Sequence, residues 1–193
     1  MYKKQMTLQR ITSFILLAAA VLVFVYSLGI MTDLYDSLYL ASSYKEGHRN
    51  YVEGASIYLE MQPFNRELTT ASIILIISAV ALFVFRSNDR RKYYIANYIT
   101  IGVNAVANIA VSIWALINVF AYKAQFLLVD FEKLAKIAET YKINYTESTF
   151  WFDASVVVFG FVFLATALSI ANLVWKIILM RAEKKLIEEG KEA

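Results

Sequence analysis

Four long segments of the chain contain no charged residue and are rich in apolar side chains. They are residues 11–31, 68–85, 93–122 and 154–175. Crossing about 30 Å of hydrocarbon takes roughly 20 residues of α-helix, so each segment approaches or exceeds the length needed. None of them shows the apolar–polar alternation of a transmembrane β-strand. The sequence therefore predicts an all-α membrane protein built as a four-transmembrane-helix bundle.

Composition supports a membrane protein over a soluble one. The chain is 59% hydrophobic and 18% charged, whereas soluble domains are usually about 45–50% apolar and about 25% charged. Its 193 residues suit one domain. The first apolar segment is longer than the roughly 7–15 residues of a signal-peptide core. We therefore expect that segment to be retained as a helix.

The expected layout is a single integral membrane domain over residues 1–193. It comprises membrane helices at about 11–31, 68–85, 95–122 and 154–180, outer loops at 32–67 and 123–153, a cytoplasmic link at 86–92 and a cytoplasmic tail at 181–193.

The distribution of basic residues predicts the orientation. Twelve of the nineteen Lys and Arg residues lie in the N-terminal tail, the short link and the C-terminal end, and the other seven lie in the two long loops. Because Lys and Arg favour the cytoplasmic side of short loops, we expect both termini to be cytoplasmic. The same bias disfavours an antiparallel homodimer, which needs two opposite insertions of one chain.

The first outer loop carries helical signals. Leu34, Leu38 and Ala41 have the spacing of one helix face. Pro63 is expected to end a short helix, because the residue before a proline avoids helical angles. Asn65 is then the expected N-cap of the second membrane helix.

The second outer loop contains an amphipathic pattern. Its apolar residues repeat at 4-3-4-3 spacing and are Leu127, Phe131, Leu134, Ala138 and Tyr141. This spacing makes one apolar stripe along a helix. We expect the helix to pack on the first outer loop and form a small helical extracytoplasmic cap. The alternative is a helix that binds a partner or lies on the lipid surface.

The third apolar segment holds an unusual number of amides. Asn97, Asn104, Asn108 and Asn118, together with Ser112, fall on one side of a helix. Lipid cannot satisfy an amide, so this side should face protein or water. The fourth segment offers a small polar complement in Thr166, Ser169 and Asn172.

Two interpretations of this asparagine face remain open. The amides can hold helices or subunits together through interhelical hydrogen bonds, or they can line a polar path or small-molecule site. The four segments contain no Asp, Glu, His or Arg, and proton-coupled transport usually needs a buried ionisable group. Lys176 directly follows the last segment, and we expect its side chain to reach the cytoplasmic headgroups.

Residue counts exclude several classes of chemistry. The chain has no cysteine, which removes thiolate catalysis, disulfides and cysteine metal sites. With one histidine, it cannot form a multi-histidine metal site by itself. Phosphate-loop, nucleophile-elbow and zinc-protease motifs are absent. We therefore expect no catalytic residue, cofactor or metal site. A net charge of only +3, with no basic block containing aromatics, argues against nucleic acid.

The sequence thus predicts a non-catalytic multi-pass membrane protein, an accessory or scaffold subunit of a membrane complex such as a transporter. Its expected partners are the lipid bilayer and other membrane subunits or a second copy of itself. Long outer loops without cysteine fit a bacterial plasma membrane. The alternative function is a small transporter or channel that uses the asparagine face.

Overall fold

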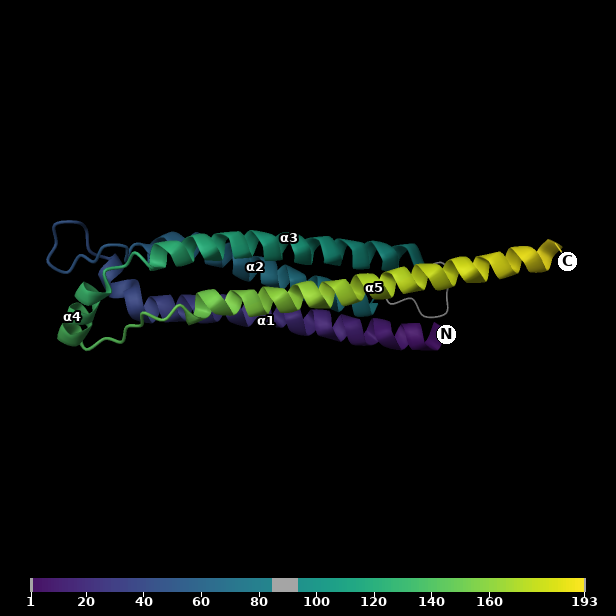
Figure 1. Cartoon of the computed structure of the whole chain (residues 1–193), viewed down its shortest axis with the longest axis horizontal. Helices are drawn as coiled ribbons and strands as arrows, with labels where there is room; N and C mark the ends of the chain where they lie inside the picture. The colour runs from purple at the N-terminus through teal and green to yellow at the C-terminus, as the bar shows by residue number, and fades with distance from the viewer. Residues whose placement is uncertain (1, 85–93, 193) are drawn as a thin grey trace. The chain divides into compact units, whose positions relative to one another are not determined.

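The computed structural model describes residues 2–84 and 94–192, and their regular structure is helical throughout. The helices are α1 (Tyr2–Ser42), α2 (Ile57–Val84), α3 (Tyr94–Phe126), α4 (Phe131–Tyr141) and α5 (Phe150–Glu192) (Figure 1). No β-strand occurs in these two ranges, so the predicted all-α class is confirmed. The predicted cytoplasmic link at 86–92 lies outside the described residues.

Four of these helices are long and apolar enough to cross a membrane. The candidate spans are Lys4–Ser42, Ile57–Phe83, Asn97–Phe126 and Phe150–Gly190. The prediction of four such helices is confirmed, although each helix is longer than the apolar segment within it. In α1 the reason is visible. The predicted face of Leu34, Leu38 and Ala41 is buried, with each residue at most 1% exposed, and the helix therefore continues beyond the apolar segment to Ser42.

The prediction that Pro63 ends one helix and that Asn65 begins the next is wrong. Helix α2 is continuous through both residues. A proline inside a helix removes one backbone hydrogen bond, but packing on either side of it outweighs this loss. Met61, Phe64 and Leu68 lie on one face of α2 and are at most 5% exposed, so interrupting the helix there would separate this buried row.

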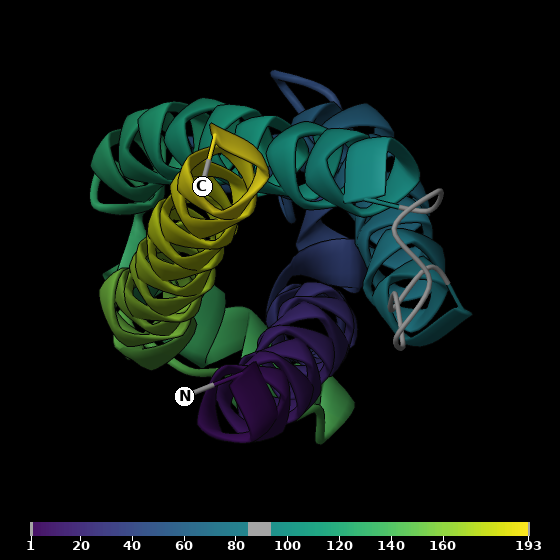
Figure 2. The same cartoon turned by 90° about the vertical axis from the view of Figure 1, so that its right-hand side faces the viewer.

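The chain divides into two compact units. The first unit contains Met1–Ala20, Ile74–Ala110 and Phe161–Ala193. Within it, α1 contacts α2 through the rings of Phe14 and Phe83, whose centroids are 4.8 Å apart. Hydrogen bonds join α2 to α3, α3 to α5, and α5 back to α1. Four helix segments therefore follow one another in a closed ring, an order that can be followed in Figure 2.

The second unit contains Val21–Ile73 and Val111–Gly160. Its core is largely aromatic. The rings of Tyr26 in α1 and Phe159 in α5 are 5.8 Å apart, and those of Phe64 in α2 and Trp114 in α3 are 5.1 Å apart. Gly29 of α1 lies against the ring of Trp151, which would overlap any Cβ placed there. The close approach of these two helices thus depends on glycine.

Helix α4 confirms the predicted helix in the second loop, and the structure shows that Asp130 is its N-cap. The Asp130 carboxylate accepts a hydrogen bond from the Lys133 backbone N–H at 3.0 Å. The apolar stripe was predicted only in part. Leu134 and Ala138 are buried, whereas Leu127 and Tyr141 are 60% and 41% exposed. The prediction failed at Leu127 because α3 ends at Phe126 and a turn separates it from α4.

Helix α4 and the turn before it contact the loop between α1 and α2. The Asp130 backbone N–H donates to the Glu53 carbonyl at 3.1 Å. Asn50 Nδ2 donates to the Tyr141 hydroxyl at 2.7 Å, and this bond lowers the pKa of Tyr141 below its ordinary value because it stabilises the phenolate. Gly54, at φ +79°, leaves room for the Val129 backbone, whose Cα would lie only 3.0 Å from a Cβ at this position. Both loops are therefore held in one defined arrangement within the second unit.

Candidate functional site

A row of polar side chains lies on the buried face of α5 in the first unit. Thr166, Ser169, Asn172 and Lys176 follow one another at spacings of three, three and four residues, which places them on one side of the helix. All four are at most 4% exposed. The predicted α5 candidates are therefore interior residues, and the row extends one turn further to include a lysine.

Lys176 is buried among the helices and does not extend to the surface of the chain, which differs from the expected reach to the headgroups. Its side chain is 1% exposed. The amine donates to Asn97 Oδ1 of α3 at 2.6 Å and to Gln9 Oε1 of α1 at 3.5 Å. It also lies 5.7 Å from the ring centre of Tyr98. Snorkelling needs a free path to the interface, and here carbonyl oxygens from two neighbouring helices hold the amine inside.

Two glutamines of α1 complete this group. Gln5 Nε2 donates to Asn172 Oδ1 at 3.1 Å and to Gln9 Oε1 at 3.5 Å. Gln5 is fully buried and Gln9 is 2% exposed. We refer to Gln5, Gln9, Asn97, Asn172 and Lys176 as the Lys176 cluster.

Gln5 and Gln9 were missed because they precede the first apolar segment. Their i, i+4 spacing, continued by the buried Thr12 and Ser13, is a polar helical stripe that could have indicated an interior face.

The central asparagines of α3, Asn104 and Asn108, form their hydrogen bonds outside the Lys176 cluster. Asn104 Nδ2 donates to Ser78 Oγ of α2 at 2.7 Å. Asn108 Nδ2 donates within α3, to the Asn104 carbonyl at 2.8 Å and to Asn104 Oδ1 at 3.0 Å. The described hydrogen bonds of these two residues thus join α3 to α2 and to itself, and not to the polar row of α5.

The remaining members of the predicted asparagine face belong to the second unit. Ser112 is fully buried, whereas Asn118 is half-buried and donates to the Trp114 carbonyl at 2.8 Å. Helical periodicity correctly placed Asn97, Asn104, Asn108 and Ser112 on a buried side. The five residues nevertheless have different surroundings, and only Asn97 belongs to the Lys176 cluster.

Several buried polar atoms of the first unit have no hydrogen-bond partner. They are Gln5 Oε1, Gln9 Nε2, Asn108 Oδ1, Thr166 Oγ1 and Asn172 Nδ2. Leaving a buried donor or acceptor unpaired costs about 1–3 kcal/mol, so such atoms in a native protein usually bind water or a ligand. Three of the five, Gln5 Oε1, Gln9 Nε2 and Asn172 Nδ2, belong to the Lys176 cluster.

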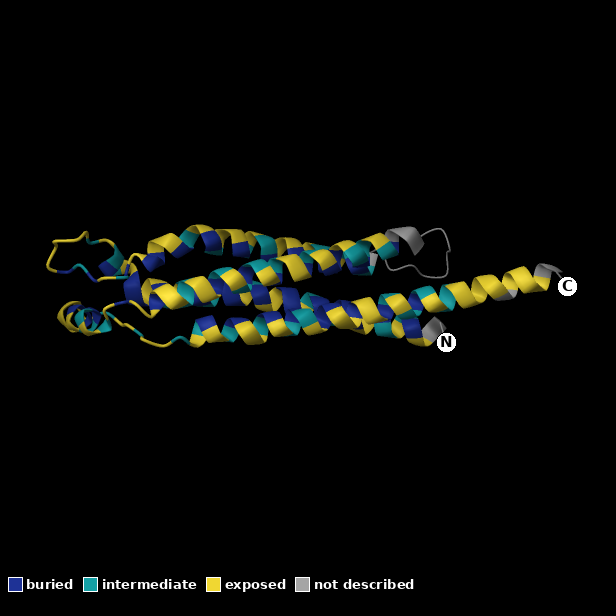
Figure 3. Cartoon of the chain, turned by 45° about the horizontal axis from the view of Figure 1, so that its top comes forward, coloured by how far each residue is buried: buried dark blue, intermediate teal, exposed yellow. Residues whose placement is uncertain are grey.

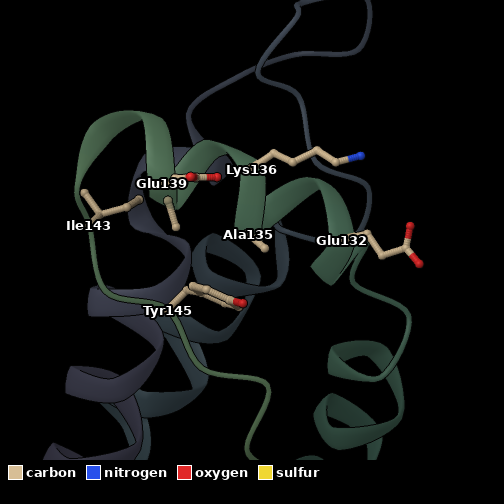
Figure 4. A pocket seen from close by; sticks show the side chains of 7 residues that line it. Glu132, Ala135, Lys136, Glu139, Ile143 and Tyr145 are labelled. Atoms are coloured by element: carbon tan, nitrogen blue, oxygen red, sulfur yellow. The ribbon is translucent and has the colours of Figure 1, made fainter.

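An open groove of about 670 Å³ is lined by residues of α4 and of the segment after it, including Glu132, Lys136, Glu139 and Tyr145 (Figure 4). Its side chains are those of a solvated helix with both signs of charge. Among the residues that the structure describes, no group of three or more His, Cys, Asp or Glu side chains could hold a metal ion.

Comparison with protein-family models, with curated proteins and with solved structures gave no match to this chain.

Proposed function

We propose that the chain is a non-catalytic multi-pass membrane protein that serves as an accessory or scaffold subunit of a bacterial membrane complex such as a transporter. The observation that carries this proposal is the hydrogen bond made by the Asn104 side chain. Its amide donates to Ser78 on a neighbouring helix, as expected of a residue that holds helices together. Asn108 is bonded to α3 itself, so the central amides contribute to packing.

The outer faces of the helices support a membrane location. Ile77, Val106 and Val157 are 63%, 68% and 74% exposed within the chain. Figure 3 shows such exposed positions recurring along each long helix beside buried ones. Exposed apolar side chains in this number are unfavourable in water and favourable against lipid or another membrane helix.

We further propose that both termini are cytoplasmic and that α4, with the loop before α2, forms an extracytoplasmic cap. The bias of basic residues toward the N-terminal tail, the link at 86–92 and the C-terminal end supports this orientation. The contacts of Asp130 with Glu53 and of Tyr141 with Asn50 support a folded cap.

The proposed function is tested by purifying the tagged chain from its native membrane in mild detergent after brief cross-linking. An accessory subunit should recover one larger membrane protein in constant ratio, and Asn104→Leu should lower that ratio or loosen the chain itself. A preparation that contains only this chain and conducts a solute in liposomes would contradict the proposal.

That second outcome is the competing function, a small transporter or channel. The observation in its favour is Lys176, because an amine buried among amides supplies the interior charge that transport sites usually need. Flux of labelled solutes into liposomes, compared between the native chain and Lys176→Gln, separates the two functions.

A further inference from the structure

A groove lies along α1 beside the first turn of α5, within the second unit. Its volume is about 390 Å³, and its lining includes Val25, Leu28, Thr32, Asp33 and Asp36 of α1 and Trp151 of α5. Small-molecule sites in proteins usually have volumes of about 300–1,000 Å³. The groove therefore has the size of a ligand site, and its lining combines apolar side chains, two carboxylates and one aromatic ring.

The two ends of the groove differ in polarity. Val25 and Leu28 belong to the first apolar segment and are 50% and 48% exposed. Asp33 and Asp36 follow that segment, and residues three apart are neighbours on a helix surface. At about 1.5 Å per residue, Val25 and Asp36 are roughly 16 Å apart along the helix axis. The groove thus runs from an apolar end to an acidic end.

The two carboxylates have no cationic partner in the described part of the chain. Within residues 2–84 and 94–192, neither Asp33 nor Asp36 forms an ion pair or a hydrogen bond. Two like charges three residues apart on a helix repel each other, so a bound cation would stabilise this end. The Thr32 hydroxyl donates to the Leu28 carbonyl at 2.9 Å, which leaves its oxygen as a further acceptor.

Trp151 adds an aromatic wall that is held in place by packing. Its ring lies against Gly29, where no Cβ would fit. Its ring centroid is also 6.4 Å from that of Tyr26 and 5.5 Å from that of Phe150. Tryptophan is the aromatic side chain that attracts an ammonium group most strongly, within about 6 Å of its ring. Carboxylates and an indole ring in one groove are complementary to an organic cation.

We propose that this groove binds a lipophilic ammonium cation, meaning an amine or quaternary ammonium with an apolar tail and no phosphate. The positive head lies by Asp33, Asp36 and Trp151, and the tail lies along Val25 and Leu28. A phospholipid with an amine headgroup fits less well, because its phosphate would lie beside the two carboxylates. The inference goes beyond the proposed function and depends neither on the orientation of the chain nor on transport.

The test uses the full chain in neutral maltoside detergent at mildly alkaline pH. Dodecyltrimethylammonium is titrated in, and the bound fraction is measured by native mass spectrometry. Two comparison probes separate the head from the tail. Dodecyldimethylamine oxide has the same tail without net charge, and tetramethylammonium has the head without the tail. The native chain should bind dodecyltrimethylammonium about fivefold or more tightly than either comparison probe, since both parts contribute.

Substitutions at the acidic end make the test specific to the groove. Asp33→Asn with Asp36→Asn removes both charges at constant size and should weaken dodecyltrimethylammonium binding by on the order of tenfold, as expected of two partly exposed charge interactions. Asp36→Lys places a fixed cation there and should abolish binding. Glu67→Gln is the matched control, because Glu67 is an exposed carboxylate of the same unit that does not line the groove, and binding should be unchanged.

Equal binding of dodecyltrimethylammonium and either comparison probe would overturn the proposal, because the groove would then recognise only a tail or only a charge. Absence of binding by the native chain, or equal binding by the native chain and the double variant, would overturn it as well. Circular dichroism checks that the helices persist. If the double variant fails to fold, Asp36→Asn alone decides the outcome, because Asp36 is exposed and has no described bonding partner to lose.

Discussion

Replacing Asn104 and Asn108 separately by leucine distinguishes two roles for the asparagine face. From the sequence alone the two amides are equivalent, and their joint loss is expected to cost about 1–3 kcal/mol if each makes one interhelical bond. The structure makes them unequal. Asn104 bonds to Ser78 on α2, whereas Asn108 bonds only to Asn104 among the described contacts.

The magnitudes follow from these contacts. Interhelical hydrogen bonds in membranes average about 0.6 kcal/mol and reach about 1.7 kcal/mol, so Asn104→Leu should lower the free energy of unfolding by about that range. Ser78 Oγ keeps its bond to the Leu75 carbonyl at 2.9 Å, so no orphaned hydroxyl adds to the cost. Asn108→Leu removes an unpaired buried Oδ1, and its effect should be near zero or stabilising.

Unfolding in mixed micelles of SDS and a mild detergent, followed by circular dichroism, measures these changes. A double-mutant cycle of Asn104→Leu with Ser78→Ala isolates the interhelical bond. Asn118→Leu is the matched control, since Asn118 is half-buried and bonded to its own helix. A coupling energy of zero, or a loss at Asn108 equal to that at Asn104, would refute the reasoning. Unchanged stability with abolished solute flux would instead favour a polar path.

Further substitutions test separate features. Gly29→Ala should destabilise the chain by about 1–3 kcal/mol, because the added Cβ overlaps the ring of Trp151. Gly102→Ala should stabilise α3 by about 0.5–1 kcal/mol, because its Cβ would meet no atom within 4 Å. Equal melting temperatures for the two variants would count against the packing of Gly29 on Trp151. Pro63→Ala should stabilise α2 by about 1–3 kcal/mol in the same unfolding assay, and a loss of stability would show that the proline is needed. The chain has no cysteine of its own, so a cysteine placed at His48 or Lys136 should react with an impermeant thiol reagent from outside the cell. Tags at Lys3 and Ala193 should be cytoplasmic. Labelling of the two cysteines only after lysis would reverse the proposed orientation.

Much of the helical architecture could be predicted from local patterns. Long uncharged segments dictate helices, because in an apolar setting a chain must satisfy its backbone hydrogen bonds internally. The buried face of Asn97, Asn104 and Asn108 follows from helical periodicity alone. Helix α4 follows from the Asp130 cap and the 3.6-residue period. These properties depend on residues within one or two turns of each other.

The tertiary structure decided what local patterns leave open. Periodicity places Lys176 on the same side as Asn172, but only the approach of Gln9 and Asn97 from α1 and α3 keeps its amine inside. Pro63 is a helix breaker by its own geometry, and only the burial of Phe64 and its neighbours on one face keeps α2 continuous. In both cases a contact from a distant part of the sequence outweighs a local preference, because the free energies of packing and buried hydrogen bonding are as large as the local preference itself.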